Sequence, residues 1–156
     1  MLITRYTVLL LVTWVGPSTL TLSRYTYSLT SIGHFVSFLI SVVLFVLMGR
    51  SLKKRRHQHR FFTGLFVGSF VGALGTGISE TIRHLPPAAR AFSQYVPQVP
   101  TQAAFTMLTL HAIPSALLAA AMFAVLFGGL GAIATWWGGV TKRTAFPGPK
   151  NPKPNP

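Results

Sequence analysis

The stretch 29-LTSIGHFVSFLISVVLFVLMG-49 sets the architecture of this chain, because it carries no formal charge over its whole length. A helix needs about 20 predominantly apolar residues to cross the hydrocarbon core of a bilayer. The Val, Ile and Phe residues of this stretch would also suit a strand in water, but a lone strand cannot satisfy its backbone hydrogen bonds in lipid. The stretch therefore predicts a membrane-spanning helix over 29–49.

Two further apolar blocks follow, over 61–82 and 103–139. The first has about the length of one span, but a straight helix over the second would measure roughly 55 Å, against a bilayer core of about 30 Å. Pro114 removes a backbone donor and crowds the preceding turn of a helix. We therefore expect the last helix to be kinked or broken near Pro114. Its span would cover 114–138, and residues 103–112 would lie at the outer interface.

The N-terminal segment has two interpretations. One early cation, Arg5, precedes a short apolar stretch and then Gly16 and Pro17, a pattern typical of a signal peptide. The same residues also describe a short first span over 6–22, which we favour because the chain stays weakly apolar after Pro17. The predicted fold class is thus all-α: a multi-pass transmembrane helical bundle with four spans, or with three spans plus a cleaved signal peptide.

A basic loop, 50-RSLKKRRHQHR-60, separates two of the predicted spans and sets their direction. Loops rich in Lys and Arg stay in the cytoplasm, so this loop orients the whole chain. The prediction is a multi-pass protein of the cell membrane with cytoplasmic N- and C-termini and a proline-rich outer loop over 83–102. Clusters of this kind also attract anionic lipid head groups. The residues expected to make these lipid contacts are Lys53, Lys54, Arg55, Arg56 and Arg60.

The composition limits the rest of the chain. Residues 1–143 form one predicted transmembrane domain, and residues 144–156 form a predicted disordered, proline-rich cytoplasmic tail. The net charge of +13 comes from Lys and Arg clustered between apolar blocks, which argues against nucleic acid as a partner. There is no cysteine, which removes disulfides, thiolate metal sites and cysteine nucleophiles.

Small residues repeat every four positions in two of the blocks. Such spacing forms a groove along one side of a helix, and close backbone approach at small residues is what joins helices in lipid. We predict that the two ridges pack against each other, although either could instead serve a homo-oligomer or a larger membrane complex. The predicted packing residues are Gly64, Gly68 and Gly72 in one ridge, and Ala112, Ala116, Ala120, Ala124, Gly128 and Ala132 in the other.

Ionisable residues from three segments are predicted at similar depth near the outer face. Glu80 is the only acidic residue of the chain, and Arg83 follows it at i+3 on the same helix face. The plainest interpretation is a salt bridge between Glu80 and Arg83. The alternative is a cluster of His34, Glu80, His84 and His111 that binds a divalent metal or haem, or relays protons.

These patterns favour a role in helix packing over a catalytic role. The chain has no phosphate-binding glycine loop, zinc-protease motif or nucleophile elbow, and its one carboxylate excludes paired-carboxylate catalysis within one chain. We therefore predict a non-enzymatic accessory or assembly subunit, and the sequence assigns it no cofactor. The alternatives are an oligomeric transport or ion-conducting protein that uses the outer His/Glu cluster, and a haem- or metal-binding membrane subunit.

Overall fold

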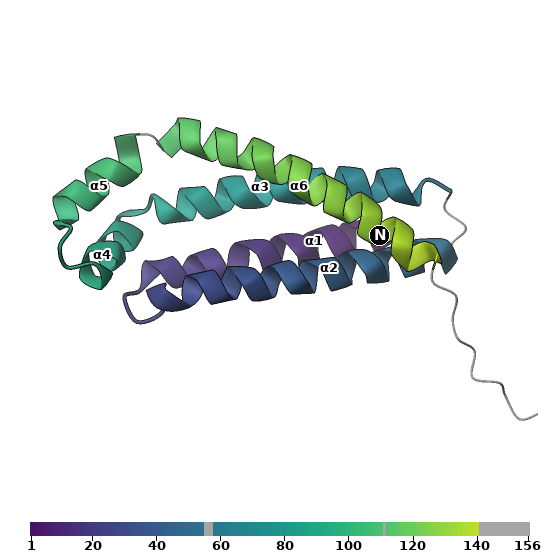
Figure 1. Cartoon of the computed structure of the whole chain (residues 1–156), viewed down its shortest axis with the longest axis horizontal. Helices are drawn as coiled ribbons and strands as arrows, with labels where there is room; N and C mark the ends of the chain where they lie inside the picture. Colours follow the sequence, from purple (N-terminus) through teal and green to yellow (C-terminus); the bar gives the residue numbers. More distant parts are fainter. Residues whose placement is uncertain (55–57, 111, 141–156) are drawn as a thin grey trace, which may run out of the picture.

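The described part of the chain is built from helices. The computed structural model describes residues 1–54, 58–110 and 112–140 (Figure 1), so the predicted tail, Arg55, Arg56 and His111 lie outside it. All the regular elements of these ranges are helical, as the fold class predicts. In chain order they are α1 (Leu2–Val15), the 3₁₀ helices η1 (Gly16–Leu22) and η2 (Tyr27–Leu29), α2 (Thr30–Lys54), α3 (Arg60–Arg83), α4 (Pro86–Tyr95), α5 (Thr101–Leu110) and α6 (Ala112–Val140).

Three helical segments are long and apolar enough to cross a membrane: Tyr27–Lys54, Arg60–Arg83 and Ile113–Val140. Many of their large apolar side chains face outward rather than into the core. Phe66 is 72% exposed and Val125 is 75% exposed, and many similar side chains accompany them. Lipid is the solvent that such surfaces need, so the chain has the make-up of a membrane protein.

The helices form one bundle with a distinct cap at one end. Figure 1 shows α1, α2, α3 and α6 running along the long axis, with α4 and α5 together beyond the end of α3. We call this the α4 end, and the opposite end, where α2 ends and α3 begins, the loop end. Two side-chain hydrogen bonds align α1 with its neighbours: Tyr6 Oη to Ser51 Oγ (3.1 Å) at the loop end, and Trp14 Nε1 to Thr76 Oγ1 (3.2 Å) nearer the α4 end.

Two of the expected loops are partly helical. The first half of the loop over 50–60 continues α2 through Lys54, because Leu52 packs into the core of the bundle at 1% exposure. The proline-rich segment over 83–102 contains α4. Its two prolines occupy the first helical turn, where a missing N–H costs nothing, and the buried face of α4 carries Ala88, Ala89 and Ala91.

The long third block is described as two helices, one on each side of residue 111. Helix α5 ends at Leu110 and α6 begins at Ala112. Pro114 is the third residue of α6, where its N–H would have had no partner within the helix. The conformation at residue 111 lies outside the described ranges, so a kink near Pro114 stays a prediction.

Glycines hold α6 directly against the backbones of its neighbours. A Cβ added at Gly64, Gly68 or Gly72 of α3 would overlap carbonyl oxygens of α6. Gly49 of α2 lies in the same way against the Thr135 backbone, and Gly138 of α6 lies against the Val46 backbone. Only a residue without a side chain permits this approach.

The ridge predicted on α6 lies beside these contacts. The α3 glycines approach the carbonyl groups of Phe123, Phe127 and Gly131. Each of these residues comes one position before a member of the predicted ridge. Gly128 and Ala132 are buried, Ala116, Ala120 and Ala124 are half-buried, and the side chain of Ala112 is not described.

The polarity of the buried side chains changes along the length of the bundle. Its apolar core lies toward the loop end and includes Leu10, Phe45, Met48 and Val71. Most of the buried hydroxyl groups lie toward the α4 end, and these are the groups of Ser18, Thr21, Thr30, Ser37, Ser41, Thr76 and Ser79. Thr135 is also fully buried but lies toward the loop end, against Gly49 and Gly64.

Replacing Gly68 by Ala tests the contact between α3 and α6. The added methyl group would push against the Phe127 carbonyl, and we expect a loss of roughly 1–3 kcal/mol in stability, typical of overpacking. Thermal unfolding in detergent micelles measures it. Gly77→Ala on the same helix is the matched control: nothing lies within 4 Å of a Cβ there, so stability should hold or rise by about 0.5–1 kcal/mol. Equal melting temperatures for the two variants would contradict the contact.

Candidate functional site

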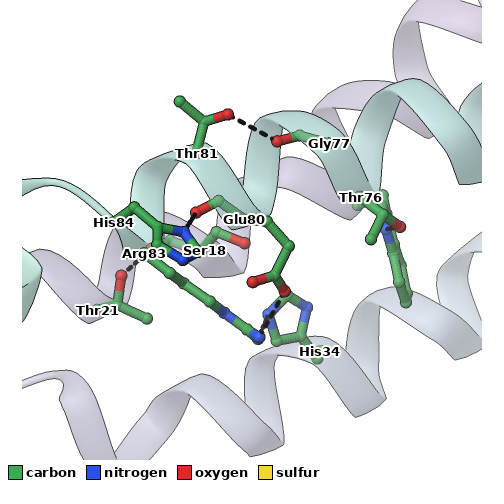
Figure 2. A network of polar contacts seen from close by, with 10 residues as sticks. Ser18, Thr21, His34, Thr76, Gly77, Glu80, Thr81, Arg83 and His84 are labelled. Carbon is green, nitrogen blue, oxygen red and sulfur yellow. Dashed lines mark hydrogen bonds and ion pairs between the residues drawn. The ribbon is translucent and has the colours of Figure 1, made fainter. Parts of the chain in front are cut away.

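The candidate site is a polar cluster at the α4 end, where η1, α2 and α3 meet (Figure 2). We define it by five residues: Ser18 of η1, His34 of α2, and Ser79, Glu80 and Arg83 of α3. The α3 residues lie in the last two turns of that helix. His34 lies about one turn into α2, which runs antiparallel to α3, so the two polar helix ends are brought to the same depth.

The carboxylate of Glu80 is bound by the next turn of its own helix. Arg83 Nη1 donates to Glu80 Oε1 at 2.9 Å, with the Arg83 side chain 39% exposed and that of Glu80 18% exposed. The i,i+3 spacing puts both groups on one face, and the basic Arg83 also suits the negative C-terminal end of α3. Because Arg83 is open to solvent, the pair contributes at most about 1 kcal/mol.

Arg83 also joins α3 to α2. Its Nη2 atom lies 3.3 Å from His34 Nε2. A guanidinium has only donors, so His34 Nε2 accepts this hydrogen bond and the neutral imidazole carries its proton on Nδ1. His34 Nδ1 is buried and has no hydrogen-bond partner among the described residues. The contact with Arg83 therefore favours the tautomer of His34 that carries its proton on Nδ1.

Trp14 of α1 forms the apolar side of the cluster. Its ring centroid lies 5.6 Å from that of His34, and its Nε1 donates to Thr76 on α3. The indole comes this close because Gly75 of α3 has no side chain: a Cβ there would meet Trp14 Cδ1 at 2.7 Å. Trp14 also packs edge-on against Phe127 of α6, with centroids 4.5 Å apart. Through Trp14, helices α1, α3 and α6 are all packed together beside His34.

Several buried hydroxyl groups near the cluster are unusual for an apolar setting. Ser18 is fully buried and Ser79 is 4% exposed. Their Oγ atoms, like Thr30 Oγ1, have no hydrogen-bond partner within the described part of the chain. Thr21 Oγ1, by contrast, donates to the Ser18 carbonyl at 2.6 Å. Leaving a buried hydroxyl without a partner costs about 1–3 kcal/mol, so this concentration of hydroxyls favours a polar guest such as water.

The predicted four-residue cluster is only partly assembled by the described residues. His34 and Glu80 are brought together through Arg83, whereas His84 Nδ1 lies 2.5 Å from the Glu80 carbonyl at the end of α3. His111 is outside the described ranges. Three neighbours, Trp14, Ser18 and Ser79, were not predicted from the sequence. Of these three, only Ser79 could have been found from the sequence. It follows Gly72 by seven residues and so lies on the same face of α3 as Gly64, Gly68 and Gly72.

Metal binding finds no support in this geometry. No group of three or more His, Asp or Glu side chains comes together within residues 1–54, 58–110 and 112–140. His34 Nε2 and Glu80 Oε1 are both bonded to the Arg83 guanidinium. A cation could use these atoms only after Arg83 moved, so the metal and haem interpretations stay predictions.

The predicted lipid-binding cations differ in their surroundings. Lys53 and Lys54 are exposed at the end of α2, where they can reach head groups. Arg60 is half-buried, its Nη1 atom is enclosed, and its guanidinium lies against Gly139 near the end of α6. Arg60 therefore packs onto the C-terminal end of a helix, where a cation is favoured.

Comparison with known proteins gives no assignment: no protein-family model, curated protein or solved structure matches this chain. Its function must therefore be inferred from the geometry of the bundle and of the polar cluster.

The tautomer of His34 is directly measurable. We expect ¹⁵N NMR of the protein in bilayers at neutral pH to show a protonated Nδ1 and an unprotonated Nε2, since Nε2 accepts from Arg83. Arg83→Met should abolish that preference, and Lys54→Met, an exposed cation at the opposite end, should leave it intact. A protonated Nε2 in the unmodified protein would contradict the bond between Arg83 and His34.

Proposed function

We propose that this chain is a small integral protein of the cell membrane that serves as a non-catalytic accessory or assembly subunit. In this proposal it crosses the bilayer four times, with the loop end and both termini in the cytoplasm and the α4 end outside. The orientation rests on the basic residues from Arg50 to Arg60.

The fourth span would be α1 together with η1. From the rise per residue of α and 3₁₀ helices, the two together measure roughly 35 Å, enough to cross a hydrocarbon core of about 30 Å. Leu10 and Trp14 of α1 are buried in the core of the bundle. Removing this segment would uncover that core, which favours a retained helix over a cleaved signal peptide.

The outward face of α6 is the observation that carries the subunit proposal. Its inward face is held by glycine contacts, while Val125 and Ile133 point outward at 75% and 64% exposure. Gly129 lies between them at i,i+4 spacing and has open space where a Cβ would be. Small residues on an open face of a membrane helix permit another helix to approach closely.

The outward face of α3 carries large aromatic side chains, unlike the α6 face around Gly129. It carries Phe62, Phe66 and Phe70 at the same spacing, all more than half exposed. Bulky rings leave no room for close backbone approach and suit contact with lipid chains. We therefore assign α6 to a partner helix, either from a second copy or from another membrane protein, and α3 to lipid.

Photo-crosslinking in intact membranes tests this assignment. A photoreactive phenylalanine at position 125 should give a discrete protein adduct, because the proposal places a partner helix there. The same probe at position 66 should give none, because it would face lipid. The mass of the adduct identifies a second copy or another subunit.

Equal adduct yields at positions 125 and 66, or no protein adduct at position 125, would overturn the accessory role. Both probes sit at exposed positions, so neither should disturb folding.

A second candidate function is ion or proton conduction by an oligomer. The observation that favours it is the contact between His34 and Arg83, set among buried hydroxyl groups of three segments. Such hydroxyls can hold water inside a bundle, and His with water can pass protons. Four helices rarely enclose a pathway alone, which is why this candidate requires several copies.

Proteoliposomes separate the two candidates. If the chain conducts protons through the cluster, pH-dye measurements should show flux that His34→Ala abolishes. His59→Ala is the matched control, because that histidine is exposed at the loop end. Absence of flux in the unmodified protein, or unchanged flux in a folded His34→Ala variant, would exclude conduction through His34.

A further inference from the structure

A cleft at the α4 end brings together two arginines from distant parts of the chain. Its volume is about 310 Å³, and it lies between the connection from η1 to η2 and one face of α4. The connection contributes Ser23, Arg24 and Tyr25, and α4 contributes Arg90 and Gln94. Both arginines are exposed. The cleft is separate from the polar cluster, whose residues do not line it.

One of the two guanidinium groups is held in place by its neighbour. Arg24 Nη2 donates to Tyr25 Oη at 2.6 Å, and the guanidinium carbon lies 4.6 Å from the centroid of the Tyr25 ring. An arginine stacked on an aromatic ring keeps the free edge of its donor fork available. The hydroxyl groups of Ser23 and Tyr25 can add hydrogen bonds beside that fork.

The chain has no side-chain carboxylate to neutralise this cleft. Glu80 is the only acidic residue, and Arg83 already binds it. Two positive charges that line one cleft repel each other. An anion that binds between them is attracted by both and reduces this repulsion. The net charge of +13 adds a general attraction for anions.

We infer that the cleft binds a phosphate group between Arg24 and Arg90. The guanidinium fork matches the geometry of phosphate oxygens and bonds them in pairs. In chain order, the residues that line the cleft precede α2 and follow α3, the two spans that meet at the α4 end. In the proposed four-span arrangement this end would lie at the lipid head groups. The phosphate can therefore belong to a phospholipid or to a soluble phosphate compound.

A fluorescence titration tests the inference on the full chain in a maltoside detergent, which contains no phosphate. The protein has no cysteine, so Gln94→Cys places a single environment-sensitive dye at the exposed rim of the cleft. The titrants are inorganic phosphate and dihexanoylphosphatidylglycerol, with chloride at matched ionic strength as the reference. We expect a saturable change with at least one phosphate titrant and none with chloride.

Two double variants test whether the fluorescence response depends on Arg24 and Arg90. Arg24→Gln with Arg90→Gln should weaken the response about tenfold or more, as expected for losing charge-assisted hydrogen bonds. Lys53→Gln with Lys54→Gln removes the same charge from exposed positions at the loop end and should leave the response unchanged. Circular dichroism confirms that both variants stay helical.

Each outcome supports or removes the site. Saturation with the phospholipid alone identifies a membrane lipid as the source of the phosphate, and saturation with inorganic phosphate alone identifies a soluble one. A response that does not saturate, that chloride reproduces, or that survives in the Arg24→Gln, Arg90→Gln variant would overturn the inference.

Discussion

Backbone-to-backbone contact at glycine holds this bundle together. Within a bilayer, apolar side chains gain nothing by leaving lipid for one another, so helices associate where their backbones can approach closely. Gly64, Gly68 and Gly72 of α3 provide that approach over residues 123–131 of α6, and Gly49 and Gly138 extend it to α2. The three long apolar helices are therefore fixed relative to one another, while their large side chains remain available to lipid.

This rigid frame positions the polar half of the interior. Because α2 and α3 are antiparallel, His34 near the start of one helix meets Arg83 at the end of the other. Arg83 donates to both His34 and Glu80, so it is the residue through which the two helix ends are linked. The Arg83 side chain is 39% exposed, whereas Trp14, a member of the apolar core, packs against His34. The hydrogen-bonded contact between His34, Arg83 and Glu80 therefore lies at the α4 end of the bundle.

Both ends of the bundle carry exposed basic residues that attract anions. Lys53 and Lys54 are exposed at the loop end, and Arg24 and Arg90 line a cleft at the α4 end. Glu80, the only acidic residue, is already paired with Arg83, so no side-chain carboxylate remains to neutralise these basic groups. An excess of positive charge at both ends suits a protein that spans a bilayer between two layers of anionic head groups.

The helical class, the three long apolar segments and the pair Glu80–Arg83 could all be predicted from the sequence alone. These features follow from local properties: a backbone in lipid must bond within its own helix, and residues at i,i+3 share a helix face. That the α3 glycines meet carbonyl groups one residue before the predicted α6 ridge emerged only from the packed bundle. The same is true of Trp14 beside His34, and of the cleft that Arg24 and Arg90 both line. Hydropathy and spacing do not encode how far each helix is rotated about its axis or which helix lies beside it, and those two variables select the residues that touch.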